Sequence, residues 1–222
     1  MTWIVAIIIF ELTAFTLCRF LPADRKLVFL RYATVINLIL VGLTASKLAD
    51  FGIGVSNVAS LFYAAVFLSQ FILIKEFGSK VARATVPVAL TAVTSLLLLR
   101  FFLANVPTVA GNEAMSNAYL QLASNAPTIA VASFVAFYAA QQVMILATEK
   151  LSYFPTWIQY LSVCFLAQIV DSLIFFPVAF TSGDLPFDIH VLQIGAVGFV
   201  VKILFVIISV PIVWVLVKEE KD

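Results

Sequence analysis

The chain has 222 residues, of which 63% are hydrophobic and only 11% charged, and its formal net charge is +1. Soluble domains are about half apolar and about a quarter charged, so a soluble fold of this length would leave large apolar patches exposed to water. The small net charge argues against nucleic acid as a partner. The apolar residues form long continuous runs, which favour transmembrane helices over the alternating pattern of a β-barrel.

Seven apolar runs follow one another, and each is long enough to cross about 30 Å of hydrocarbon. They cover residues 2–20, 28–46, 54–74, 82–104, 128–148, 157–181 and 190–217. The longest break between them, 105–127, has room for a short interfacial helix at 114–122. We therefore predict an all-α, polytopic membrane helix bundle of about seven transmembrane helices, with residues 1–222 in a single transmembrane domain.

The first run is predicted to stay in the protein as a transmembrane helix. It lacks the basic n-region and the small-residue cleavage site of a signal peptide, and its apolar part is followed by Arg19 and Arg25. Glu11 stands at its centre, where a carboxyl group needs either a proton or a partner. Asn37, in the second run, is expected to face the bundle interior.

The distribution of basic residues predicts the orientation of the helices. If the N-terminus lies outside, ten of the thirteen basic residues fall in the inner loops and the C-terminal tail. These ten are Arg19, Arg25, Lys26, Arg31, Lys75, Lys80, Arg83, Lys150, Lys218 and Lys221. Because cytoplasmic loops carry an excess of Lys and Arg, we predict an N-out/C-in topology.

The sixth run carries an ionisable residue near its middle, Asp171. An ionised side chain in hydrocarbon costs at least about 2.5–3.5 kcal/mol, so it usually faces a partner or a wet cavity. Gln168 precedes Asp171 by three residues and shares its helix face. Lys202, in the last run, is the natural partner, and the preceding Gly198 permits close helix approach. The pair could be a structural salt bridge, or a gate or substrate ligand.

Two further residues are candidates for the same interior. Gln141 lies in the middle of the fifth run, where its amide is expected to point inward. Phe175 lies four residues after Asp171 and could stack on a flat ligand, although such residues more often face lipid or fill the core.

The sequence lacks the motifs of a hydrolytic or redox enzyme. It has no P-loop, no HExxH zinc motif and no GxSxG elbow. Cys18 and Cys164 lie within apolar runs without metal-binding spacing, and the single His190 cannot build a metal site without partners. We therefore expect neither an enzyme nor a bound metal or cofactor.

The stretch AQIVDSLIFFPVAF at 167–180 resembles the sixth-helix signature of the queuosine precursor transporters, also called putative vitamin uptake transporters. Lys202 with Pro211 resembles the family's last helix, and Asn57 with Tyr63 its third. The similarity is scattered over about 37–217. It implies a prokaryotic cell (inner) membrane protein that imports a 7-deazaguanine such as preQ0 or preQ1. The implied substrate-binding residues are Asp171, Gln168, Gln141, Lys202, Phe175 and Asn57.

Several positions depart from the family pattern. Phe71 and Met144 stand where the family usually has Asp, Lys75 replaces a Glu or other polar residue, and Thr128 replaces an Arg. With less of the charged lining, two alternatives to a transporter stay open. The chain could be the substrate-binding subunit of an ATPase-driven vitamin importer, or a non-transporting structural subunit of a membrane complex. Partners would then be a membrane subunit or a second copy of the chain, besides lipid and a small molecule.

Overall fold

The computed structural model describes residues 2–45, 47–107, 117, 126–181 and 189–217. Seven helices in these residues are long and apolar enough to cross a membrane, which confirms the predicted helix bundle. They are α1 (Thr2–Leu17), α2 (Ala23–Thr44), α3 (Ala59–Phe77), α4 (Ser79–Ala104), α6 (Ala126–Lys150), α7 (Thr156–Thr181) and α8 (Ile189–Leu216). Apart from residue 117, the predicted interfacial helix at 114–122 lies outside the described residues.

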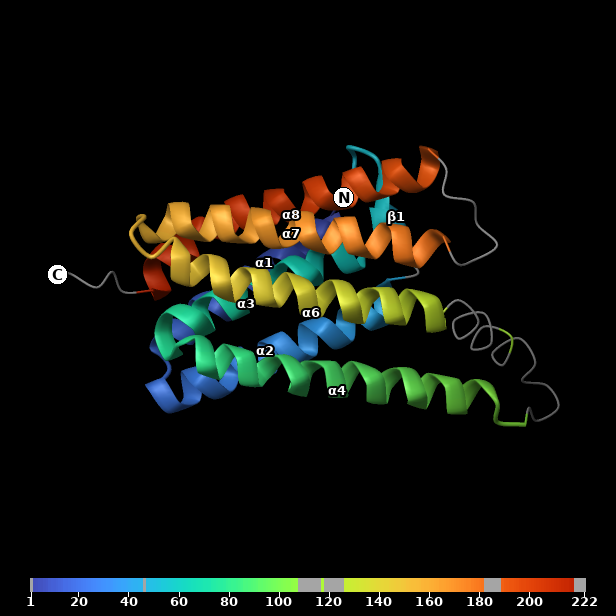
Figure 1. Cartoon of the computed structure of the whole chain (residues 1–222), viewed down its shortest axis with the longest axis horizontal. Helices are drawn as coiled ribbons and strands as arrows, with labels where there is room; N and C mark the ends of the chain where they lie inside the picture. Colours follow the sequence, from blue (N-terminus) through green and yellow to red (C-terminus); the bar gives the residue numbers. More distant parts are fainter. Residues whose placement is uncertain (1, 46, 108–116, 118–125, 182–188, 218–222) are drawn as a thin grey trace.

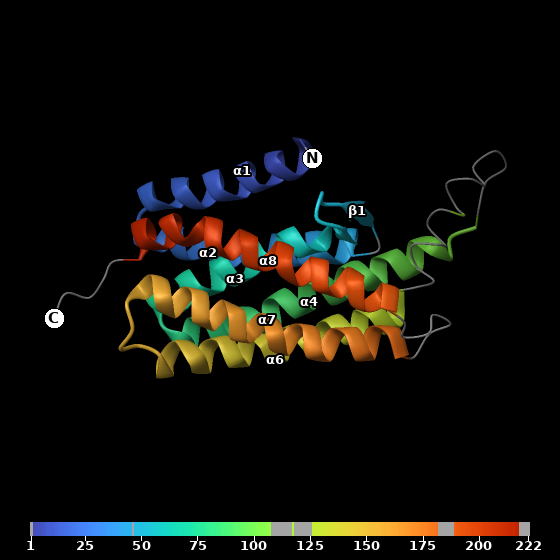
Figure 2. The same ribbon diagram turned by 90° about the horizontal axis from the view of Figure 1, so that it is seen from above.

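The bundle is arranged around α3 (Figure 1). Fifteen of its nineteen residues are buried, and it packs against α2, α4, α6 and α8. A helix that is hydrophobic all round is suited to such a central position. By contrast, α1 lies along one side of the bundle, next to α8 (Figure 2).

A short β-hairpin separates α2 from α3, and the sequence analysis did not predict it. Strand β1 (Leu48–Asp50) pairs antiparallel with β2 (Val55–Asn57). In the turn, the Gly52 amide donates to Asp50 Oδ1 at 2.7 Å, and both Gly52 and Gly54 have positive φ angles. The third run was expected to be helical from residue 54. This was wrong because Ile53 and Val55 are apolar and the strand is only three residues long, so hydropathy merged the hairpin with the helix that follows.

A single glycine forms the turn that follows Phe77. Gly78 alone separates α3 from α4, and its φ of 85° lies in a region that residues with a Cβ rarely adopt. The Gly78 amide donates to the Ile74 carbonyl at 3.0 Å and so ends α3. The chain therefore reverses within one residue at this end of the bundle.

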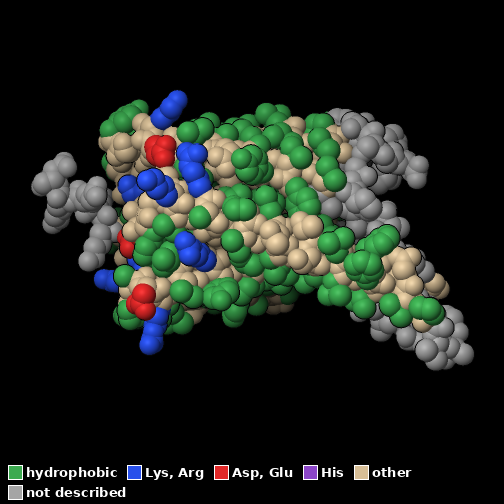
Figure 3. All heavy atoms as spheres, turned by 60° about the horizontal axis from the view of Figure 1, so that its bottom comes forward, with side chains coloured by type: hydrophobic (Ala, Val, Ile, Leu, Met, Phe, Trp, Pro, Cys, Tyr) green, Lys and Arg blue, Asp and Glu red, His purple; other side chains and the backbone are tan. Residues whose placement is uncertain are grey.

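The outer surface has the character of a lipid-facing one. Large apolar side chains such as Phe10, Leu173 and Trp214 are each exposed by about two thirds, at 70%, 69% and 66%. Lys and Arg side chains gather towards one end on the face drawn in Figure 3. We call this the basic end; it holds the start of α2, the α3–α4 turn and the end of α6 (Figure 1). The apolar girdle with charges at its end confirms an integral membrane protein.

Candidate substrate cavity

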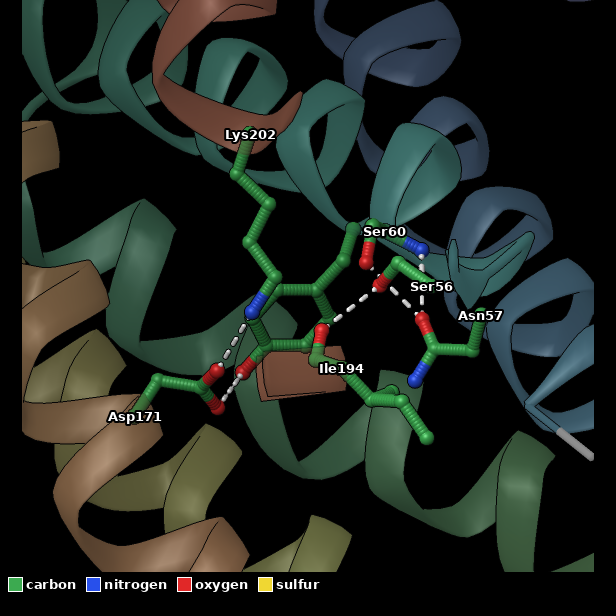
Figure 4. Close-up of polar contacts among 7 residues, drawn as sticks. Ser56, Asn57, Ser60, Asp171, Ile194 and Lys202 are labelled. Carbon is green, nitrogen blue, oxygen red and sulfur yellow. Dashed lines mark hydrogen bonds and ion pairs between the residues drawn. The ribbon is translucent and has the colours of Figure 1, made fainter. Parts of the chain in front are cut away.

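An ion pair lies at the centre of the bundle between α7 and α8 (Figure 4). Lys202 Nζ donates to Asp171 Oδ2 at 2.9 Å, which confirms the predicted pairing. The two side chains are only 11% and 8% exposed. Each therefore offsets much of the desolvation cost of the other.

Tyr63 of α3 completes this charged group. Its hydroxyl donates to Asp171 Oδ1 at 2.7 Å, so both carboxylate oxygens accept a hydrogen bond. Lys202 Nζ also lies 4.7 Å from the centre of the Tyr63 ring, within cation–π range. The sequence analysis named Tyr63 as part of the resemblance but gave it no role in the site. Its hydroxyl, which must find a partner when buried, was the available signal.

Asn57 lies in β2 and not in a transmembrane helix as the sequence analysis assumed. Its Oδ1 accepts from the Ser60 amide at 3.1 Å and from the Ser60 hydroxyl at 2.8 Å (Figure 4). Asn57 thus caps the start of α3. No hydrogen bond to its Nδ2 is found among the described residues, and Asn57 lines the central cavity. This leaves an amide donor available beside the ion pair.

Glycine lets the hairpin and α3 approach α8 closely. A Cβ on Gly198 would lie 2.7 Å from Ser56 Oγ and 3.0 Å from Ser60 Oγ, distances that require something to move. Ser56 Oγ in turn donates to the Ile194 carbonyl of α8 at 3.1 Å. The prediction that Gly198 permits close approach is confirmed, although the partner is the hairpin as much as a helix.

These side chains surround a cavity of about 60 Å³. Every transmembrane helix except α1 contributes to its wall, together with β2. Asp171, Lys202, Phe175 and Asn57 are among its lining residues. Aromatic rings form much of the remaining wall, and they belong to Tyr63, Phe134, Phe137, Phe175 and Phe199. A cavity of this volume has room for a few water molecules, and they would bind at its polar groups.

The two predicted glutamines lie outside the cavity wall. Gln168 and Gln141 are fully buried, as is Gln70. Neither amide atom of any of the three has a hydrogen-bond partner among the described residues. All three lie on the basic-end side of the cavity. Gln168 precedes Asp171 on α7 by about one turn, Gln70 follows the cavity residue Tyr63 on α3, and Gln141 follows the cavity residue Phe137 on α6. Buried amides without partners are rare and usually indicate water or a ligand.

A comparison with known protein families identifies the kind of protein that contains this cavity. Residues 57–216 match the family described as putative vitamin uptake transporters, which is more than half of the chain. The chain belongs to this family. Among curated proteins and among solved structures, nothing matches it. As a member of a transporter family it is a vitamin-uptake-type transporter and not an enzyme, and all of the cavity's charged residues fall within the matched range.

Two residues noted as departures from the queuosine precursor pattern lie in the apolar core of this transporter. Phe71 and Met144 are fully buried. The Phe71 ring packs against Tyr160 at 5.0 Å between ring centres. The side chain of Thr128 lies outside the described residues. The core on the basic-end side of the cavity is therefore filled by apolar packing at these two positions.

The basic end of the transporter is held by a second ion pair. Lys26 Nζ donates to Glu76 Oε2 at 2.7 Å and to the Leu216 carbonyl at 3.3 Å. One ammonium group thus joins α2, α3 and α8. Its side chain is 11% exposed and that of Glu76 is 21% exposed, so water screens the pair less than an open surface pair. This contact ties three of the helices together at the basic end.

Metal-binding geometry is not found in the described part of the chain. No group of three His, Cys, Asp or Glu side chains comes together there. Cys18 and Cys164 are both buried and free, and the side chain of His190 lies outside the described residues. The cavity's chemistry is therefore that of one ion pair, one tyrosine hydroxyl, amide and hydroxyl groups, and aromatic rings.

Proposed function

We propose that this transporter imports a small, planar, polar molecule through the cavity at Asp171, and that its substrate class is the queuosine precursors, 7-deazaguanines such as preQ0 or preQ1. The observation that carries the proposal is the combination of Asp171, Lys202 and Tyr63 with phenylalanine walls in one buried cavity. Family membership supplies the transport class.

The chemistry of such a base suits the groups in the cavity. Its donor edge, formed by ring and amino N–H groups, matches the carboxylate of Asp171. Its exocyclic carbonyl can accept from Lys202 or from the free amide of Asn57. The flat ring system can stack on Phe175, which lines the same cavity. Binding would then exchange contacts within the ion pair for contacts to the base.

The volume of the cavity indicates a state without substrate. Pockets for small molecules usually measure about 300–1,000 Å³, whereas this cavity measures about 60 Å³. Substrate entry therefore requires the surrounding helices to separate. The Lys26–Glu76 pair holds the basic end closed, so entry from the opposite end is favoured. We propose that the basic end faces the cytoplasm of a prokaryotic cell, with the N-terminus outside, which makes transport an import.

Uptake in a host that lacks its own precursor transport and synthesis tests the proposal. Cells expressing the protein should accumulate preQ0 or preQ1, and Asp171→Asn should abolish accumulation. The matched control is Glu149→Gln, because Glu149 forms only an exposed, 3.9 Å pair with Arg83, and it should transport normally. The proposal fails if well-expressed protein gives no uptake of either compound, or if Asp171→Asn transports as the wild type does.

A second function rests on the same family description. A substrate-binding subunit of an ATPase-driven vitamin importer would need the same cavity but would not transport alone. Purified protein reconstituted without other subunits separates the two. Uptake by these proteoliposomes supports a self-sufficient transporter, whereas binding without uptake, together with co-purified ATPase subunits, supports the subunit.

A further inference from the structure

A second intramembrane carboxyl group lies outside the cavity wall. Glu11 is near the middle of α1, in the span Thr2–Phe20, and is only 5% exposed. This helix lies along one side of the bundle (Figure 2) and precedes the residues that match the family. The cavity does not use Glu11, yet a carboxyl group at this depth needs a physical explanation.

One side chain contacts the Glu11 carboxyl group. Asn37 Nδ2 of α2 donates to Glu11 Oε2 at 3.3 Å, longer than the usual N–H···O distance of about 2.7–3.2 Å. The same Nδ2 also donates to the Ala33 carbonyl at 3.0 Å. Among the described residues no Lys or Arg forms an ion pair with Glu11. An ionised carboxylate here would have one long hydrogen bond and no compensating charge.

The charged and titratable groups on the neighbouring elements are engaged or distant. Lys202 of α8 and Tyr63 of α3 are bound to Asp171, and Lys26 of α2 is bound to Glu76. Arg31 lies six residues from Asn37 along α2, about 9 Å of helix rise. Of the remaining groups, Tyr32 lies near the middle of α2 with its side chain exposed. The others lie towards the ends of their elements, and they are Cys18, Arg19, Asp24, Arg25, Lys75 and His190.

The neutral acid fits this site better than the carboxylate. Asn37 Oδ1 is a buried acceptor with no hydrogen-bond partner among the described residues. A carboxylic acid and a primary amide are complementary, since the amide N–H donates to the acid carbonyl and the acid O–H donates to the amide carbonyl. The observed contact is one half of that arrangement. Protonation of Glu11 supplies the donor for the other half and satisfies Asn37 Oδ1.

We propose that Glu11 is a proton-binding site, held as a carboxylic acid paired with the Asn37 amide, and that the transport cycle loads and releases this proton. The reaction is reversible protonation: water on one side supplies the proton to Glu11, and water on the other side receives it. The part of the proposal that concerns transport rests on the proposed function. The pairing of Glu11 with Asn37 stands on geometry alone.

Helix α2 connects this site to the cavity. Leu38, which follows Asn37 directly, and Val41, one turn later, both line the cavity. A substrate that widens the cavity would displace α2 and with it the Asn37 amide. Displacement of α2 would also admit water to the Glu11 carboxyl group, and hydration of the carboxylate favours proton release. Substrate binding and proton binding would thereby act on one helix.

Infrared spectroscopy of the reconstituted full chain tests the proton site without any substrate. The wild type should show the carbonyl band of a protonated carboxylic acid at neutral pH. Glu11→Gln should remove this band, and Glu149→Gln should keep it. Asn37→Leu should shift the band to the higher frequency of an acid that has lost its hydrogen bond. A wild type without the band, or a band that survives in Glu11→Gln, would overturn the assignment.

Transport by the same proteoliposomes tests the coupling, with preQ1 as the probe. The Glu11→Gln amide can still pair with Asn37, so this variant should fold and should exchange preQ1 across the membrane at the wild-type rate. It should lose accumulation driven by a pH gradient, so that the inside-to-outside ratio stays near one. Gradient-driven accumulation equal to that of the wild type would refute coupling. If the wild type moves no preQ1 while the infrared band is present, the substrate proposal fails and the proton site stands.

Discussion

Removal of the Lys202 ammonium group should destabilise the protein strongly, because it leaves a charged neighbour behind. In Lys202→Met, the hydrogen bond from Tyr63 at 2.7 Å is the one that Asp171 keeps among the described residues, in a side chain that is 8% exposed. Breaking a buried ion pair by removal of one partner costs about 3–5 kcal/mol. The free energy of unfolding should fall by about that amount, unless Asp171 takes up a proton, which would reduce the loss.

The double variant separates the charge effect from packing. In Lys202→Met with Asp171→Asn, the amide is neutral and can still accept from the Tyr63 hydroxyl, and methionine fills much of the lysine's volume. We expect each single variant to lose about 3–5 kcal/mol and the double variant to be close to the wild type, so the interaction energy should approach the sum of the two single losses, about 6–10 kcal/mol. Unfolding in mixed micelles at a fixed pH measures all four proteins.

This reasoning would be refuted by two results. One is a Lys202→Met variant whose free energy of unfolding lies within about 0.5 kcal/mol of the wild type, the range of ordinary surface substitutions. The other is a double variant that loses the sum of the two single losses. Either would mean that the pair is already solvated enough for its charges to act independently.

Three further substitutions test other contacts. Tyr63→Phe should lower the free energy of unfolding by about 1.5–3 kcal/mol, because a hydrogen bond to a charged group is lost; an unchanged unfolding midpoint would contradict this. Gly198→Ala should lower the free energy of unfolding by about 1–3 kcal/mol through overpacking. The control is Gly42→Ala, whose Cβ would meet Leu96 at an ordinary 3.5 Å and which should be neutral or stabilising. Equal changes in the free energy of unfolding for the two variants would contradict the tight contact at Gly198. Lys26→Met should loosen the basic end and increase maleimide labelling of Cys18, which is 1% exposed; labelling at the wild-type rate would show that the end stays closed.

Much of the fold was predictable because helix length is a local property. An apolar run long enough to span hydrocarbon must satisfy its backbone hydrogen bonds internally, so all seven spans could be placed from hydropathy. The β-hairpin was missed because hydropathy detects long apolar runs and its strands have only three residues each. Val55 and Ile53 are as apolar as the helix that follows, and the glycines around the turn with the polar residues Ser56 and Asn57 were the signals that separate them from it.

The candidate site was predictable only in part. Asp171 and Lys202 could be paired because two opposite charges at membrane depth have few other ways to lower the free-energy cost of their burial. The contact of Tyr63 with Asp171 and the cap formed by Asn57 were not predicted, since neither Tyr63 nor Asn57 carries a charge; the need of a buried tyrosine hydroxyl for a partner was the signal for the first. Gln141 and Gln168 were expected in the cavity on the same argument as Asp171, and the structure places them in the core beside it.

The sequence by itself determined how many helices cross the membrane, which charged residues require partners, and at which end the basic residues gather. Tertiary structure alone decided that α3 is the central helix, that Tyr63 contacts Asp171, and that the Glu11 carboxyl group meets the Asn37 amide. The physical reason is the solvent. In water an apolar stripe marks the buried face of a helix, but in lipid both the exterior and the core are apolar, so hydropathy does not tell the faces apart. Helix faces are then chosen by packing and hydrogen bonds between residues far apart in the chain.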